Sequence, residues 1–137
     1  YLDLSYEKRK VSKKKIIEME IKKTGKLFSF CCVAPAIIKK KDNQEIKFFE
    51  NLGCKIGLLF QIADDLIDFH GNSISAGKQT GKDQKKGKAT LISLMGYTNA
   101  VKYCDRLIID TNKTLKKYGS KSKNLKDTLE YILKRDR

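Results

Sequence analysis

The sequence predicts an all-α fold in a single domain over residues 1–137. Three observations favour helices: the 137 residues include only one proline and nine glycines, hydrophobic residues make up 40% of the chain, and strand-like alternation of polar and apolar residues is hard to find. A chain of this length is typical of one small domain, and its apolar share is sufficient for a globular core.

Two helices are expected in the first 40 residues, on either side of Lys23-Thr24-Gly25. The first covers 13–23 with Ser12 as its N-cap, and the second runs from 26 to about 39 with a kink at Pro35. Glycine destabilises a helix interior by about 1 kcal/mol relative to alanine, so Gly25 predicts a break between the two helices.

The longest helix is expected in the middle of the chain. Asp42-Asn-Gln-Glu45 is a capping-box pattern that opens this helix, which should run to about Phe69. Apolar residues lie on nearly all of its faces, which predicts a position inside a helical bundle. The polar segment 70–89 is longer than a plain connection, and we interpret it as a functional loop.

Three shorter elements complete the predicted fold. A short turn over 90–95 precedes an amphipathic helix at about 98–118, whose apolar positions alternate steps of three and four. Gly119 is a suitable C-cap for this helix. A last helix is expected at about 123–134.

The charge balance is strongly basic, with 30 Lys and Arg residues against 16 Asp and Glu residues and a net charge of +14. Such a surplus attracts polyanions. Proteins that read nucleic acids usually draw on arginines and on aromatic residues interleaved along the basic face, whereas only four of the 30 basic residues of this chain are arginines. We therefore interpret most lysines as solvated surface residues and expect no nucleic-acid partner. A basic nucleic-acid-binding helical module is the alternative.

The four cysteines do not have the paired spacing of a zinc site, and the single histidine, His70, is interpreted as an exposed loop residue. Cys31 and Cys32 lie in an apolar run, where cysteine behaves as a small buried hydrophobic residue. These features predict a reduced, cytoplasmic chain. No apolar stretch reaches the roughly 18 residues that span a bilayer, so stable membrane insertion is not expected.

The segment Phe60-Gln-Ile-Ala-Asp64-Asp65-Leu-Ile-Asp68 gathers carboxylates on the longest helix. Residues three and four apart share a helix face, so the three aspartates converge, with Gln61 one turn earlier. The rest of this helix is apolar, which favours a patch facing a cleft over a solvated acidic stripe. Carboxylates at close range need a compensating charge, and Mg²⁺ binds such oxygens together with substrate phosphates.

Glycines and lysines alternate in the loop that follows, from Gly77-Lys78 through Gly81-Lys82-Asp83 to Lys88. Glycine lets a backbone approach a ligand closely, and lysine provides a point charge for phosphate oxygens. Helix and loop together predict a metal-dependent phosphate site, with a solvated linker as the alternative for the loop. The spacing is not that of a P-loop.

These motifs together resemble a known family. Lys23-Thr24-Gly25, the acidic segment, Gly77-Lys78-x-x-Gly81-x-Asp83 and Lys88-Ala89-Thr90 are similar to motifs of the trans-prenyl diphosphate synthases, in the same order and spacing. The opening Asp3-Leu4 also resembles the end of a family motif. The resemblance covers essentially the whole chain, which looks like the C-terminal half of a bacterial farnesyl or geranyl diphosphate synthase.

The resemblance implies the C-terminal half of the isoprenoid synthase helical bundle, and a Mg²⁺-dependent prenyltransferase that joins isopentenyl diphosphate to an allylic diphosphate. It implies magnesium ligands at Asp64, Asp65 and Asp68, of which Asp65 is the least direct. Asp83 is expected to contact the residues that bind the metal or the diphosphate, without binding either directly. The residues expected to bind the allylic diphosphate are Lys23, Thr24, Gln61, Lys78 and Lys88, and catalysis is expected to depend on Lys23, Gln61 and Lys78.

Two family features are absent from the chain: the first aspartate-rich motif and the arginines that hold isopentenyl diphosphate. The chain also starts at Tyr1 without a methionine, as an excised piece would. We therefore expect one wall of an active site, inactive on its own, in a protein that forms a homodimer as the family usually does. A non-catalytic synthase-like subunit is an alternative, whereas the metal-binding triad of terpene cyclases is not matched.

Overall fold

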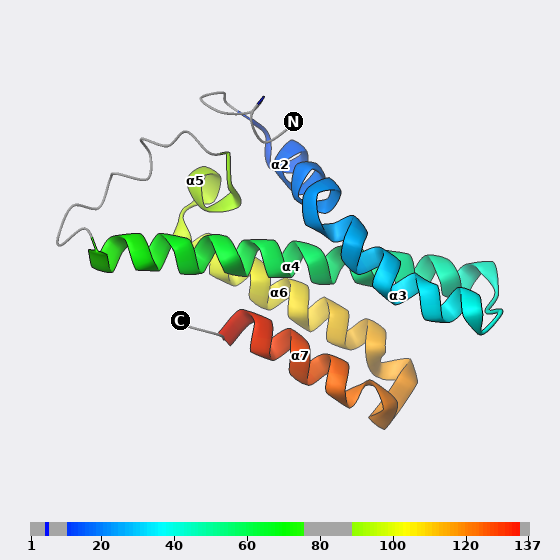
Figure 1. Ribbon diagram of the computed structural model, residues 1–137. Helices are drawn as coiled ribbons and strands as arrows, with labels where there is room; N and C mark the ends of the chain where they lie inside the picture. Colours follow the sequence, from blue (N-terminus) through cyan, green and yellow to red (C-terminus); the bar gives the residue numbers. More distant parts are fainter. Residues whose placement is uncertain (1–4, 6–10, 76–88, 135–137) are drawn as a thin grey trace.

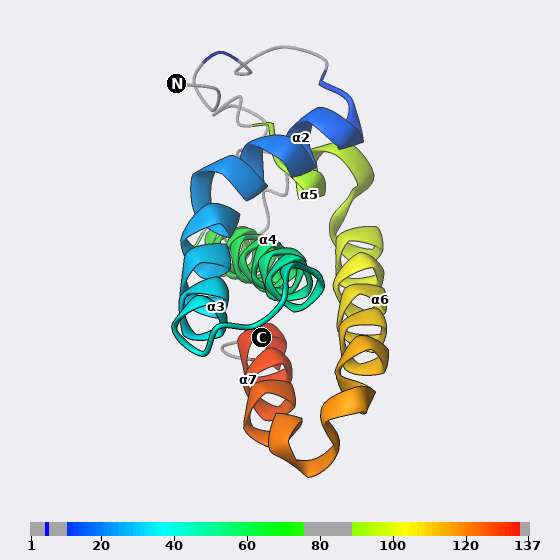
Figure 2. The ribbon, with the colours of Figure 1, turned by 90° about the vertical axis from the view of Figure 1, so that its right-hand side faces the viewer.

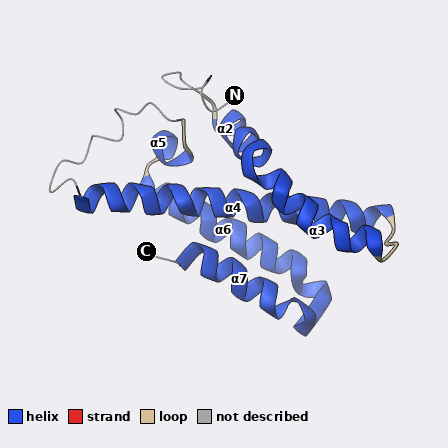
Figure 3. Cartoon of the chain, in the orientation of Figure 1, coloured by secondary structure: helices blue, strands red, loops and turns tan. Residues whose placement is uncertain are grey.

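The computed structural model describes residue 5 and residues 11–75 and 89–134, with only the backbone described for 70–75. Every regular element in these residues is a helix, as Figures 1 and 3 show, and the predicted all-α class is confirmed. The predictions for Asp3-Leu4, for the segment 76–88 and for the His70 side chain lie outside the described residues.

The N-terminal helices form one continuous run. Helix α2 (Lys13–Glu20) begins at Ser12, whose side chain accepts a hydrogen bond from the Lys15 amide, and passes directly into a π-helical turn, η1 (Ile21–Gly25), and then into α3 (Lys26–Ile38). In η1 the Lys26 amide donates to the Ile21 carbonyl, five residues back, which is the π-helical spacing. The predicted break at Gly25 is therefore wrong.

Helix α4 (Asn43–Ser75) lies at the centre of the structure. Figure 2 looks nearly along its axis and shows α3 on one side, α6 on the other, α7 below, and α2 with α5 above. Its buried side chains confirm the central position predicted from its apolar faces: Leu52, Ile56, Leu58, Leu59, Ile62, Ala63 and Leu66. The predicted end at Phe69 is wrong, because residues 70–75 continue the helix. Adding a residue to a formed helix costs far less than starting one, which lets this polar segment extend α4.

Glycines set how closely α4 approaches the N-terminal helices. A Cβ atom on Gly57 would lie 2.6 Å from the Cα of Gly25, and one on Gly53 would overlap the backbone of Phe28 and Ser29. Close backbone contact of this kind is possible only where side chains are absent. The contact explains why η1 remains helical through Gly25, since tertiary packing outweighs intrinsic propensity.

The C-terminal helices cover the remaining sides of α4, with α5 next to α2 and with α6 and α7 away from the N-terminal run (Figure 2). Helix α5 (Leu91–Met95) has a capping box between Thr90 and Ser93, and α6 (Tyr97–Leu115) leads into a 3₁₀ segment, η3 (Lys116–Ser122). Helix α6 ends three residues earlier than predicted, and Gly119 lies inside η3 with φ +53°, which favours glycine. Helix α7 (Lys123–Lys134) has its predicted bounds.

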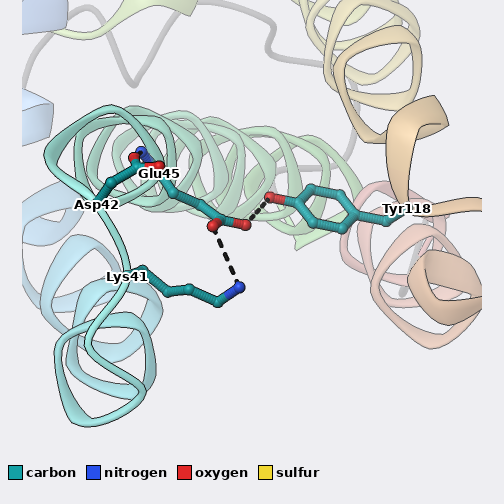
Figure 4. A network of polar contacts seen from close by, with 4 residues as sticks. All are labelled: Lys41, Asp42, Glu45 and Tyr118. Atoms are coloured by element: carbon teal, nitrogen blue, oxygen red, sulfur yellow. Dashed lines mark hydrogen bonds and ion pairs between the residues drawn. The ribbon is translucent and has the colours of Figure 1, made fainter.

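One polar network links the start of α4 to η3, as Figure 4 shows. The Asp42 carboxylate accepts a hydrogen bond from the Glu45 amide at 2.8 Å, which is the N-cap half of the predicted capping box. The Glu45 side chain, instead of closing the box, accepts from the Tyr118 hydroxyl at 3.1 Å and pairs with Lys41 at 3.3 Å. The Tyr118 ring also packs on Phe48, with ring centroids 5.6 Å apart.

The outer face of α3 is apolar and exposed. None of the four cysteines, all of which lie in the described residues, forms a disulfide. Cys31 is exposed and Cys32 only half-buried, so the expected burial of both is wrong. Cys31 shares its exposed face with Leu27, Phe30 and Ile38. Burial raises the pKa of the Cys32 thiol, with a smaller contribution from Cys31 and Cys54.

No helix in the described part of the chain is both long enough and apolar enough to cross a membrane.

The glycine contact predicts a loss of stability on substitution. Gly57→Ala places a methyl group against the Gly25 backbone and should lower the free energy of unfolding by about 1–3 kcal/mol, the usual cost of overpacking. Urea unfolding followed by circular dichroism measures the change. Asn51→Ala, at an exposed position of the same helix, is the matched control and should not destabilise the chain. Equal stability of Gly57→Ala and the wild type would contradict the close contact.

Candidate functional site

A cleft of about 300 Å³ lies where η1 and the last residue of α2 face α4 and the start of α5. Its walls are predominantly polar. The residues that line it are Glu20, Lys23, Gln61, Asp64, Asp65, Ile67, Asp68 and Thr90. Two segments about 40 residues apart in the sequence therefore meet in one site.

Most of the described residues that the motifs single out meet in this cleft. Lys23 comes from η1, and Gln61 with the three aspartates comes from two successive turns of α4. Thr24 is not part of the lining but donates a hydrogen bond to Gln61, which is. Lys78, Asp83 and Lys88 lie outside the described residues, so their predicted roles stay predictions.

Gln61 links the two walls of the cleft. Its Oε1 accepts a hydrogen bond from Thr24 Oγ1 at 3.0 Å, and its Nε2 donates to Asp65 Oδ1 at 3.3 Å. The amide oxygen thus accepts one hydrogen bond and the amide nitrogen donates another, as their chemistry requires. Beside this link the rings of Phe28 and Phe60 pack with centroids 5.3 Å apart. The chain of contacts fixes η1 relative to the acidic turns of α4.

Exposure of the aspartates increases along α4. Asp64 and Asp65 are half-buried and Asp68 is exposed, while the intervening Leu66 is buried in the core. Helical spacing explains this arrangement, since residues three and four apart share a face and the residues between them point elsewhere. The acidic face therefore points into an open cleft and not into the apolar core.

The donor atoms of the cleft fit a hard divalent cation such as Mg²⁺. Carboxylate oxygens from Asp64, Asp65 and Asp68 are ligands of the type that Mg²⁺ takes. Within residues 11–69 and 89–134, no three His, Cys, Asp or Glu side chains lie close enough together to hold a metal ion by themselves. Mg²⁺ usually keeps several waters and binds one or two carboxylates plus phosphate oxygens, so the arrangement suits an ion that arrives with a phosphorylated ligand.

Three lining residues were not identified from the sequence as part of a site: Glu20, Ile67 and Thr90. Glu20 is three residues before Lys23 on a helical run, and this spacing is a signal that places the two side chains on neighbouring positions. Thr90 belongs to the Lys88-Ala89-Thr90 motif, although only Lys88 was given a role. Ile67 has no such signal.

The family comparison agrees with this arrangement of residues. The family model described as "Polyprenyl synthetase" matches residues 1–133. The chain belongs to the polyprenyl synthetase family. This family assignment confirms the resemblance on which the sequence-based roles depend.

Alignments with individual relatives include about three quarters of this chain or more, but less than half of each relative. It is 29% identical over 136 residues to a farnesyl diphosphate synthase of Micrococcus luteus, which includes 99% of this chain and 47% of that protein. It is 36% identical over 102 residues to a geranylgeranyl pyrophosphate synthase of Geoglobus acetivorans, which includes 74% of this chain and 32% of that protein. The chain thus spans half the length of these polyprenyl synthetases or less.

A solved structure extends the comparison to the fold. An isoprenoid synthase family member from Thermotoga neapolitana superimposes with a TM-score of 0.68 at 28% identity, over 96% of this chain and 42% of that protein. The predicted isoprenoid synthase fold is confirmed by this likeness, for the part of the bundle that the chain provides.

The link through Gln61 gives a test of the geometry of the cleft. Thr24→Val removes the hydroxyl that donates to Gln61 and should lower the free energy of unfolding by about 0.5–1.5 kcal/mol, the usual net value of one hydrogen bond. Thr24→Ser keeps the donor and is the matched control. A double-mutant cycle with Gln61→Met measures the coupling between the two side chains, and zero coupling would show that they do not interact.

Proposed function

We propose that this chain provides the allylic-diphosphate wall of a prenyltransferase that condenses isopentenyl diphosphate with an allylic diphosphate to make a short-chain product of the farnesyl or geranyl type. The observation that carries the proposal is that Lys23 of η1 and the aspartates of α4 line the same cleft. A site for a metal-bound diphosphate needs both kinds of group, cations for the phosphate oxygens and carboxylates for the metal.

The proposed metal ligands are Asp64 and Asp68, with Asp65 in closer contact with Gln61 and less available for direct ligation. Bound Mg²⁺ would neutralise charge on the diphosphate and so make it a better leaving group. Its binding through phosphate oxygens as well as carboxylates agrees with the incomplete ligand set of the described residues.

Lys23 and Gln61 are the proposed catalytic residues in the described part of the chain. Cleavage of the allylic carbon–oxygen bond leaves both bonding electrons on the diphosphate, where negative charge increases. The Lys23 ammonium, placed in the cleft wall, stabilises this charge more strongly than water does, because fixed charges need no reorganisation. Thr24 and Gln61 hold the wall in place through their hydrogen bond.

Lys78 and Lys88 are proposed to contribute further cationic groups to the same diphosphate. The remaining parts of the site would come from the rest of a synthase, since the chain spans 47% of the Micrococcus luteus relative. We accordingly propose that the chain alone does not catalyse prenyl transfer. From the family resemblance we also propose that the complete enzyme is a homodimer. Relatives named for farnesyl and for geranylgeranyl products both match the chain.

The binding step gives a test that does not require the rest of the synthase. Inorganic pyrophosphate should bind the chain in the presence of Mg²⁺, and Asp64→Asn should weaken this binding at least about tenfold, equivalent to about 1.4 kcal/mol. Isothermal titration calorimetry measures both affinities. Asp105→Asn, at an exposed position of α6 that does not line the cleft, is the matched control and should bind as the wild type does.

Turnover tests the same proposal in a synthase of full family length that contains this chain. Asp64→Asn should then reduce incorporation of labelled isopentenyl diphosphate at least about a hundredfold, and removal of Mg²⁺ by a chelator should abolish it. Unchanged turnover in the Asp64 variant would refute the role of the cleft in catalysis. Binding without any turnover in the wild type would favour a non-catalytic synthase-like subunit.

A further inference from the structure

The outer face of α3 carries a row of apolar residues at the spacing of a helix that packs against a core. The row, defined as the outer stripe, repeats the positions i, i+3 and i+4 twice over about three helical turns. Its members are Leu27, Phe30, Cys31, Ala34, Ile37 and Ile38. All of them except Ala34 are exposed, and Phe30 and Ile38 are 68% and 76% exposed. A face with the pattern of a buried one is thus turned to solvent.

The opposite face of α3 already has its partner. Ser29 and Ala36 are both buried, and Ser29 lies against Gly53 of α4. Helix α3 is therefore apolar on two sides, of which one is packed on α4. A helix that is apolar on all sides belongs in the interior of a larger bundle.

Exposed apolar residues of the later helices lack this arrangement. Ile109 on α6 and Tyr131 on α7 are exposed, but the described residues three and four positions away from each are polar or charged. Single apolar residues of this kind are ordinary on protein surfaces, whereas a contiguous apolar patch marks an interaction surface. The outer stripe is of the second kind.

The comparisons favour one occupant for this surface. The chain includes 47% of the Micrococcus luteus relative and 42% of the Thermotoga neapolitana structure, so more than half of each has no counterpart in it. The outer stripe begins one helical turn after Lys23, which lines the cleft. A segment that covers the stripe would therefore lie beside the cleft, where the proposed function requires a second wall.

Charge opposes a second copy of the chain as the occupant. The net charge is +14, and the exposed Lys39 and Lys40 directly follow the last residue of the stripe. Two copies that meet face to face would bring like charges together. The same lysines favour a partner segment that has acidic residues at the border of its apolar face.

We propose that the outer stripe is the surface on which this chain docks the part of a polyprenyl synthetase that has no counterpart in it. The docked segment is a helix whose apolar row packs against the stripe and whose acidic residues lie near Lys39 and Lys40. This inference rests on the proposed function in one respect, since both require another part of a synthase to complete the cleft.

Thiol labelling tests the proposal, because Cys31 is an exposed member of the stripe. In a synthase of full family length that contains this chain, N-ethylmaleimide should modify Cys31 at least about tenfold more slowly than in the 137-residue chain, since buried thiols are unreactive. Tandem mass spectrometry measures the rate and separates Cys31 from Cys32. Tyr131→Cys places a thiol at an exposed position of α7 and is the matched control, with equal rates expected in both proteins.

Substitution within the stripe gives an independent readout. Phe30→Glu introduces a good helix former at an exposed position, so the chain alone should keep its melting temperature. In the full-length synthase the same change buries an unpaired charge and should lower the melting temperature by at least about 5 °C. Tyr131→Glu, at 69% exposure against 68% for Phe30, is the matched control and should leave both melting temperatures unchanged.

Two results overturn the inference directly: equal labelling of Cys31 in the chain and in the synthase, or a wild-type melting temperature of the synthase with Phe30→Glu. Other occupants are recognised in the chain alone. Labelling that accelerates on dilution assigns the stripe to a second copy, and labelling that is slowed by phosphatidylglycerol vesicles but not in the synthase assigns it to a lipid surface. Either outcome also overturns the inference.

The pyrophosphate titration separates this inference from the proposed function. If Cys31 stays reactive in the synthase while Asp64→Asn weakens pyrophosphate binding, the proposed function stands and the docking surface fails. If Cys31 is protected while Asp64→Asn binds pyrophosphate as the wild type does, the docking surface stands and the proposed function fails.

Discussion

Close contact between helix backbones at three glycines is the constraint on which the rest of the site depends. Gly25 in η1 lies against Gly57, and Gly53 lies against the start of α3, so the two helical runs approach more closely than side chains allow. Across this close interface the Thr24 hydroxyl donates a hydrogen bond to Gln61 at 3.0 Å. The three glycines, which have no side chain to bind a ligand, thus bring together the lysine and the carboxylates of the cleft.

The same contact explains the unusual backbone next to it. A π-helical turn inserts one extra residue and changes the direction in which the following side chains point, and such turns are frequent at functional sites. In η1 the extra residue lets Gly25 face α4 while Lys23, two residues earlier, faces the cleft. The helix can follow this less favourable geometry because buried packing on α4 stabilises it.

Much of this arrangement follows from the sequence, but the tertiary contacts do not. The spacing of apolar residues predicted α7 with its observed bounds, and the apolar faces of α4 predicted its central position. Helix-face spacing predicted that Gln61 and the aspartates share one patch, and they line one cleft. The continuity through Gly25 could not be predicted from propensity, since it depends on a glycine 32 residues away. Glu20 was missed because its burial, at 3% exposed, is a tertiary feature that its place in the sequence does not show.

The central claim is that the cleft between η1 and α4 holds a magnesium-bound diphosphate. Amide chemical shifts of the isotopically labelled chain, followed by NMR during titration with pyrophosphate and Mg²⁺, test this claim most directly. The largest shift changes should occur at Lys23, Thr24, Gln61, Asp64 and Asp65, and the shifts of α7 should change little. Changes spread over the lysine-rich surface, with none concentrated at the cleft, would contradict it.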